Sequence, residues 1–285
     1  MISATRYSSL AEINRQTELA KEIAQLQQSV SSGNRLTAPS DDPAASARIA
    51  DIRQTQADQL VWSRNADTGA SIASAADTTL TSVASLLDRA KDLVLSARND
   101  TTSAADRSSI AAELRGLATD LDTYAQQNDP TGRPLFPDGT PISLPVSSTL
   151  SLPATASRDS VFGGITTSAG TQSLSDILNA AADALENPDD ATRATAIDDS
   201  IAAIGTGVDH ITQVRADQGI RAQRFDSAKD ALASSGDQLT EEKNGLAGTD
   251  LTYAIAEFQS KQLSLQAAQT VYAQGMKASL FDLLG

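Results

Sequence analysis

The clearest pattern in the sequence is a stripe of apolar residues close to its start. Its members follow one another in steps of four, three and four residues, which places them on one side of a helix. The stripe consists of Leu19, Ile23, Leu26 and Val30. Leu10 and Ile13 continue it only after a slip of phase near Arg15, so we expect the first dozen residues to be held less firmly. The small residues Ser32 and Gly33 predict the end of this helix.

A second helix is predicted to begin at "SDDP". Pro43 suits the first helical position, and Asp42 can accept hydrogen bonds from the free amides of the first turn. Asp41 adds negative charge at the positive end of the same helix. The alternative is a metal site built on the two carboxylates, but no His, Glu or third Asp lies at ligand spacing. We therefore interpret Asp41, Asp42 and Pro43 as a helix cap.

Further helical stripes run to about residue 127 and resume at Leu174, and a different pattern lies between them. From residue 128 to 172, Pro, Gly and Thr interrupt short apolar alternations such as "TPISLPV", which predicts a small β-rich insert. Beyond the insert, Gln218, Phe225 and three leucines recur at every seventh residue up to Leu246, a heptad pattern typical of packed helices.

The last helix is predicted to carry an unbroken stripe in steps of four and three residues. A polar residue in such a stripe can fix register and partner choice, so Gln262 and Gln269 are either specificity devices or lie at the edge of the stripe. The chain then reaches an apolar tip that a partner could bury. The expected surface for assembly comprises Leu10, Ile13, Leu19, Ile23, Leu26, Val30, Leu251, Ile255, Phe258, Gln262, Leu265, Gln269, Tyr272, Met276, Leu280, Phe281, Leu283 and Leu284.

These patterns predict a mainly α fold. The first and last helices pack antiparallel into an elongated rod or coiled-coil bundle, and the small β-rich insert projects from its far end. The terminal stripes are expected to stay unpaired, and the N-terminal helix disordered, until a neighbouring subunit arrives. The expected divisions are 1–40 (N-terminal assembly helix), 41–127 (first half of the rod), 128–172 (insert), 173–248 (second half of the rod) and 249–285 (C-terminal assembly helix).

Charge and composition narrow the possible partners. The net charge of −14 argues against nucleic acid, because binding phosphates requires clustered Lys and Arg. Residues 1–56 carry six basic and six acidic side chains and residues 249–285 carry two and three, so the remaining −13 lies between them. No apolar run is long enough to span a membrane, and the start lacks the pattern of a cleaved signal peptide. The protein is therefore expected either to stay in the cytoplasm or to leave by a route that cleaves nothing.

The residues of common catalytic sites are scarce. Cysteine is absent, which excludes disulfides, thiolate nucleophiles and Cys-based metal sites. His210 is the single histidine, and Asp209 beside it points elsewhere on a helix, so we interpret His210 as a surface or packing residue. The carboxylate pairs within 187–199 have no aromatic residues nearby to hold a sugar. We expect no catalytic residues, no metal and no cofactor.

Four motifs resemble the flagellin superfamily, and more closely its hook-filament junction branch. "SVSSGNRLTAPSDDPAASA" is similar to the N-terminal signature, and its "PSDDP" to the form typical of that branch. "TGRPLFPDG" is similar to a hairpin of the insert, with Pro134 where the branch has an aromatic residue. "SRDSVFGG" resembles the strand that closes the insert, and "LQAAQTVYAQGMKASLFDLL" resembles the branch's C-terminal end. The insert is short and proline-rich for this family.

The resemblance implies a structural subunit of the bacterial flagellum, extracellular and exported without a cleaved signal. It implies hook-associated protein 1, flagellin, copies of the chain itself in a ring and a flagellar export chaperone as partners, with neither nucleic acid nor membrane among them. Two alternatives remain open: a bulk filament flagellin and, more remotely, a secreted enzyme carried on a flagellin-like scaffold.

Overall fold

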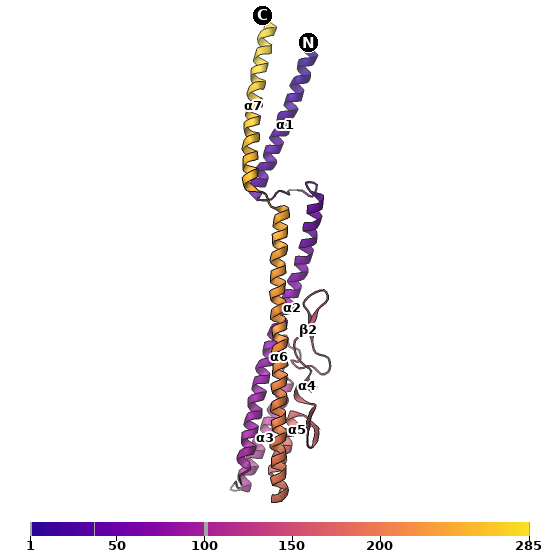
Figure 1. Cartoon of the computed structure of the whole chain (residues 1–285), viewed down its shortest axis with the longest axis vertical. Helices are drawn as coiled ribbons and strands as arrows, with labels where there is room; N and C mark the ends of the chain where they lie inside the picture. Colours follow the sequence, from indigo (N-terminus) through magenta and orange to yellow (C-terminus); the bar gives the residue numbers. More distant parts are fainter. Residues whose placement is uncertain (1, 37, 100–101, 285) are drawn as a thin grey trace. The chain divides into compact units, whose positions relative to one another are not determined.

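The computed structural model describes the backbone of residues 2–36, 38–99 and 102–284, and the side chains of residues 10–36, 38–99 and 102–274. Helices dominate this part of the chain, as the apolar stripes predict (Figure 1). The helices are α1 (Ile2–Ser32), α2 (Pro43–Ala97), α3 (Ala104–Ala125), α4 (Arg158–Phe162), α5 (Leu174–Leu185), α6 (Asp190–Ala247) and α7 (Leu251–Leu284). The strands are β1 (Ser143–Pro145), β2 (Ser151–Pro153), β3 (Ile165–Thr167) and β4 (Gly170–Gln172).

The chain divides into two compact units. One contains residues 1–57 and 236–285, and the other contains residues 58–235. Both boundaries fall inside long helices, so α2 and α6 each contribute to both units. In the described part of the chain, no helix combines the length and the apolar character that crossing a membrane requires.

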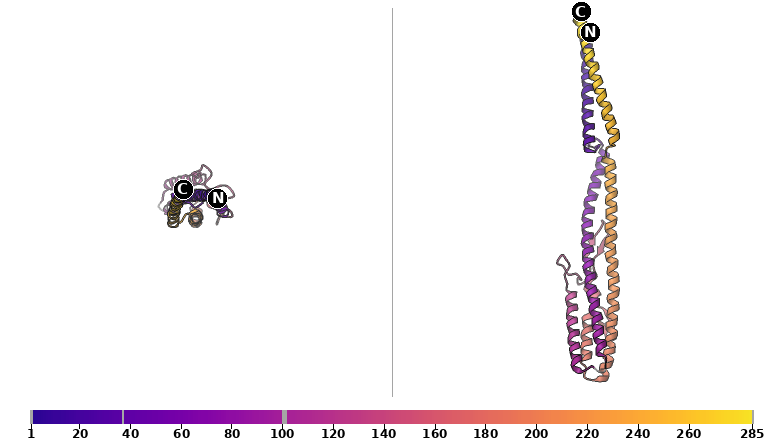
Figure 2. Two further views of the ribbon diagram at one scale, coloured as in Figure 1. Left: turned by 90° about the horizontal axis from the view of Figure 1, so that it is seen from above. Right: turned by 90° about the vertical axis from the view of Figure 1, so that its left-hand side faces the viewer.

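The unit of residues 58–235 has a continuous apolar core among α2, α3, α5 and α6. Helices α3 and α5 pack on each other and lie beside the two long helices (Figure 2). The start of α5 is fixed by Ser173 and Asp176, whose side chains bond each other's backbone amides in a capping box. Along α6 the buried core positions Ile204, Ile211 and Phe225 fall at multiples of seven residues, which confirms that the heptad pattern there reflects packing.

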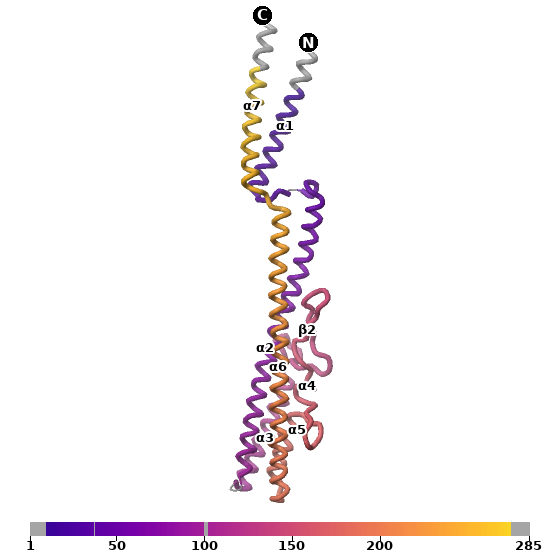
Figure 3. Tube along the Cα trace, viewed as in Figure 1, coloured from indigo at the N-terminus to yellow at the C-terminus, as the bar shows by residue number. Residues whose placement is uncertain are grey.

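The insert consists of two small antiparallel hairpins, β1 with β2 and β3 with β4, and the short helix α4 between them. Its apolar residues, among them Phe136, Leu152 and Val161, belong to the same buried cluster as the helices. The insert lies along α2 and α6 (Figure 3). The prediction that it projects from the end of a rod is therefore wrong, because its side chains complete the helical core and do not form a core of their own.

Buried Gln218 ties the insert to the helices. Its Nε2 donates hydrogen bonds to the carbonyl oxygen of Ala73 on α2, at 3.2 Å, and to that of Ala154 just after β2, at 2.9 Å. His210 on the same helix lies with Nε2 3.1 Å from the carbonyl oxygen of Val161 on α4. The polar residue in the heptad pattern thus joins three segments that are distant in the sequence.

In the other unit, the start of α2 lies beside the end of α6. Arg48 forms a two-bond ion pair with Glu242, at 2.7 Å from Nε and 3.0 Å from Nη2. Gln56 Nε2 donates to Thr240 Oγ1 at 3.1 Å. Ala45, Ile49 and Ile52 are buried on this stretch of α2. The start of α2 and the end of α6 therefore pack together, and α1 and α7 are connected to them.

Candidate assembly interface

The first and last helices of the chain pair with each other. Helices α1 and α7 lie side by side in every view, with the chain's two ends at the same end of the pair (Figures 1 and 2). The predicted stripe of α1 faces its partner, because its members are half-buried while most of their neighbours are exposed. These members are Leu19, Ile23, Leu26 and Val30. The stripe continues toward the N-terminus with polar residues, where Gln16 donates a hydrogen bond to Glu12 at 3.3 Å.

On α7 the seam consists of two columns of residues spaced by seven. Phe258, Leu265 and Tyr272 form one column, and each is half-buried. The second column contains the buried Ala254 and Ala268 with the half-buried Lys261 between them. Small residues in this column allow the two helix backbones to approach closely, which is a common use of alanine at a helix seam.

Lys261 brings a charge into the seam. Its Nζ lies 2.9 Å from Glu22 of α1 and 3.1 Å from Glu257 one turn earlier on α7. The hydrogen bonds that Lys261 donates to Glu22 and then to Glu257 raise the pKa of Lys261 above its ordinary value. A charged residue at a seam position lowers stability and fixes register. We therefore expect the Lys261–Glu22 pair to help fix the alignment of the two helices, whereas Gln262 and Gln269, which the sequence pattern placed either in the stripe or at its edge, are exposed.

The other predicted interface residues point away from this seam. Gln262, Gln269, Leu251 and Ile255 on α7 are exposed, and Leu10 and Ile13 on α1 are 58% and 47% exposed. Their exposure within one chain leaves them available to a neighbouring molecule. The side chains of Met276, Leu280, Phe281, Leu283 and Leu284 lie outside the described residues.

A further apolar surface on α7 was missed by the sequence pattern. Tyr253, Leu263 and Val271 are each 68% exposed and lie on faces of the helix turned away from the seam. Soluble proteins rarely leave several large apolar side chains exposed along one helix unless a partner covers them. The α1–α7 pair thus carries a thin inner seam and an uncovered apolar exterior.

Two short backbone segments, residues 33–35 and 247–249, connect the α1–α7 pair to α2 and α6. Arg35 N donates to Ala247 O at 2.7 Å, and Thr249 N donates to Gly33 O at 3.0 Å. These two bonds flank an antiparallel bridge between Asn34 and Gly248. Gly33 has a φ of +71°, a conformation that favours glycine and ends α1.

Arg35 links the segments that meet there. Its Nη2 donates to the carbonyl oxygen of Leu246 at 3.2 Å and to Asp42 Oδ2 at 3.3 Å. It therefore binds the last turn of α6 and the residue before α2 at once. The sequence offered one signal for this role, a basic residue in the turn after "SSGN", but nothing in it revealed a contact across more than 200 positions.

The residues predicted to cap a helix have separate roles. Pro43 is the first residue of α2, and Asp42 Oδ1 accepts a hydrogen bond from Ala45 N at 3.0 Å. The Ala45 amide, followed by Arg35, holds the pKa of Asp42 below its ordinary value. Asp41 accepts instead from Ala38 N at 2.8 Å, so its carboxylate stabilises the preceding turn. In the described part of the chain, no group of three His, Asp or Glu side chains could hold a metal ion.

Family models and known proteins match most of the chain. A model of the bacterial flagellin N-terminal helical region matches residues 4–140, and a model of the bacterial flagellin C-terminal helical region matches residues 201–284. Flagellar hook-associated protein 3 of Escherichia coli (strain K12) is 25% identical over 89% of this chain and 90% of its own length.

Solved structures share the fold. A flagellar hook-associated protein from Vibrio parahaemolyticus superposes with a TM-score of 0.64 at 18% identity, over 73% of this chain and 100% of the other. Flagellar hook-associated protein 3 from Legionella pneumophila gives 0.63 at 15% identity, over 70% of this chain and 98% of the other.

Proposed function

Because this chain belongs to the flagellin superfamily, we propose that it is a structural subunit of the bacterial flagellum that joins the hook to the flagellin filament. The observation that carries the proposal is the α1–α7 pair. Its inner seam is half-buried, and large apolar side chains such as Leu263 and Val271 are left exposed on its outside. Such a pair gains most of its buried area only when neighbouring subunits surround it.

The proposed position of the chain between the hook and the filament determines which proteins it would contact. One side of the chain accepts hook-associated protein 1, and the other receives the first flagellin subunits and nucleates the filament. Copies of the chain form a ring between them. The similarity to a hook-associated protein over 89% of the chain supports this assignment over that of a bulk filament flagellin.

The proposed location is extracellular, in the flagellum. The chain leaves the cell through the flagellar export apparatus without cleavage of a signal, and an export chaperone covers residues 251–284 until then. The lack of cysteine supports this route, since no disulfide can form to obstruct the passage of an unfolded chain. The chain works by assembly and not by catalysis.

Two charges placed in the seam test the proposal. Phe258→Asp with Leu265→Asp puts carboxylates where α7 meets α1, and an unpaired buried charge is strongly unfavourable. In cells whose own gene is deleted, this variant is expected to leave bare hooks and to shed flagellin into the medium. Normal filaments, counted by electron microscopy, would rule out the α1–α7 pair as the element of assembly.

A second variant separates the outer surface from the seam. Leu263→Asp with Val271→Asp adds the same charge on the exposed faces of α7 and leaves the seam contacts in place. It is also expected to abolish filaments, while the helix content of the purified chain stays unchanged by circular dichroism. Thr81→Asp with Ser85→Asp, on an exposed face of α2, is the charge-matched control and should assemble filaments.

A further inference from the structure

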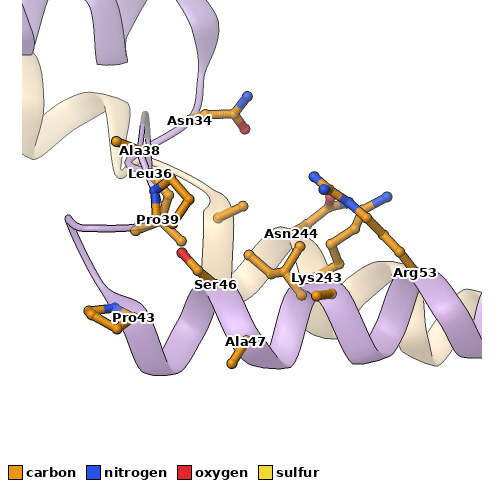
Figure 4. Close-up of a pocket in the computed structure, with 13 residues that line it drawn as sticks. Asn34, Leu36, Ala38, Pro39, Pro43, Ser46, Ala47, Arg53, Lys243 and Asn244 are labelled. Carbon is orange, nitrogen blue, oxygen red and sulfur yellow. The ribbon is translucent and has the colours of Figure 1, made fainter.

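We call the joint the segments that connect α1 to α2 and α6 to α7, residues 33–42 and 246–250. A groove lies beside this joint, between the start of α2 and the end of α6. It has a volume of about 770 Å³ and is lined by the segment after α1 together with the two helices (Figure 4). Its lining is largely apolar, with Leu36, Pro39 and Ile49 among its residues. Ala47, Ala50 and Ala247 are small enough to let another polypeptide backbone come close.

The lining contains two cations. Arg53 comes from α2 and Lys243 from α6, and both line the groove together with Asn244 (Figure 4). Among the described residues, neither cation has a carboxylate within ion-pair distance. Two acids at this end of α2 and α6 are engaged elsewhere, since Glu242 pairs with Arg48 and Asp42 with Arg35.

The chain as a whole is acidic, so most of its surface has the opposite charge to these two cations. The protein has 36 acidic and 22 basic side chains. Residues 58–235 carry 24 acidic and 13 basic side chains, a net charge of −11 out of −14. The groove is therefore a positive patch on a chain whose other unit is strongly negative, and charge complementarity favours contact between the two patches.

A closed ring of subunits requires two different, complementary patches on each subunit. A ring of more than two copies uses heterologous contacts, in which one patch of a subunit fits a different patch on the next. The groove and the acidic unit form such a pair of patches. An inorganic anion would satisfy the cations but leave the apolar lining uncovered, whereas a polypeptide segment satisfies both.

We propose that the groove binds a second copy of this chain, with a carboxylate from residues 58–235 of that copy paired to Arg53 and Lys243 and apolar side chains beside it in the groove. This rests on the proposed function, because it assigns a contact within the ring of copies.

The test uses the full chain in flagella isolated from cells that carry it in place of the native gene. A photoactivatable benzoylphenylalanine at position 50, in the lining of the groove, should crosslink the chain to another copy. Mass spectrometry should then locate the attachment within residues 58–235. A crosslink to flagellin or to a hook protein, or no crosslink at all, would overturn the proposal.

Charge variants complete the test. Arg53→Glu with Lys243→Glu should reduce the crosslinked dimer at least tenfold, and Arg53→Lys with Lys243→Arg should retain it. An unchanged dimer yield in the first variant would refute this contact while leaving the proposed function intact. The proposed function fails separately, if the variant with charges in the α1–α7 seam still builds filaments.

Discussion

At the scale of single residues, Gly69 on α2 packs closely against Phe225 on α6. A Cβ at position 69 would lie 2.2 Å from Cε1 of Phe225, far inside van der Waals contact. Phe225 is fully buried. The glycine therefore serves as the hole for an aromatic knob, and the spacing of the two long helices depends on it.

Gly69→Ala should consequently lower the free energy of unfolding by about 1–3 kcal/mol, the usual cost of overpacking a core. In the Gly69→Ala background, Phe225→Leu should cost less than it does alone, because it removes the atoms that clash. Urea unfolding of the four chains gives the coupling. Gly219→Ala is the control, since a Cβ there meets nothing within 4 Å and should leave stability unchanged or raise it. Additive effects of the two substitutions would contradict the proposed fit.

Asp42 gives the joint a pH dependence of known sign. Its folded-state pKa is held below the ordinary 3.8 by the Ala45 amide and by Arg35. Its contribution to stability is therefore fully present above that ordinary value and is lost as the pH falls through the lower folded-state value. Asp42→Asn keeps an oxygen that can cap the helix but removes the charge.

The stability difference between the native chain and Asp42→Asn, measured by urea unfolding, should consequently shrink as the pH is lowered from 6 to about 3. A difference that stays constant over this range would show that the charge has no part in the joint.

At the scale of elements, the sequence predicted the helices better than it predicted their contacts. On α1 one apolar stripe stands out, and the structure turns that stripe toward α7. On α7 large apolar residues occur on several faces of the helix. More than one series of residues in steps of four and three could therefore be drawn along it. The predicted stripe shares Phe258, Leu265 and Tyr272 with the seam but takes its second column one position too far, at Gln262 and Gln269 in place of Lys261 and Ala268.

The insert shows a second limit of the sequence pattern. Its place in the chain and its short strands could be predicted from proline, glycine and alternating apolar residues. Its position against α2 and α6 could not, because that depends on contacts such as Gln218 with Ala154, which periodicity does not encode. The hydrogen bond from Arg35 to the carbonyl oxygen of Leu246 in the joint could not be predicted from periodicity either.

The thin seam between α1 and α7 predicts weak protection of these helices in the free chain. None of the described side chains of α1 is fully buried, and on α7 only the small Ala254 and Ala268 are. Local opening is easiest where few apolar contacts hold an element. In hydrogen exchange of the purified monomer, amides of residues 10–30 should exchange much faster than those of residues 204–225 in α6. Equal protection of the two segments would contradict this expectation and show that the pair is stable without neighbours.

At the scale of the whole molecule, the two units suit two tasks. The unit of residues 58–235 is a self-contained core of four helices and an insert that completes them. The other unit holds the terminal helices, whose apolar surfaces are mostly uncovered, and the joint with its positive groove. We expect stability to depend mainly on the unit of residues 58–235, and the proposed assembly to depend on the unit of residues 1–57 and 236–285. We therefore expect substitutions in the core to act on folding and those on α7 to act on filament growth.

The central claim, that this chain is the junction on which the filament grows, is tested most directly by deleting its gene. Cells without it should carry hooks that lack filaments, seen by electron microscopy, and should release soluble flagellin into the medium. The native gene supplied in trans should restore filaments. Intact filaments in the deletion strain, or bare hooks with no flagellin in the medium or the cells, would contradict the claim, the latter because the chain would then be the filament subunit itself.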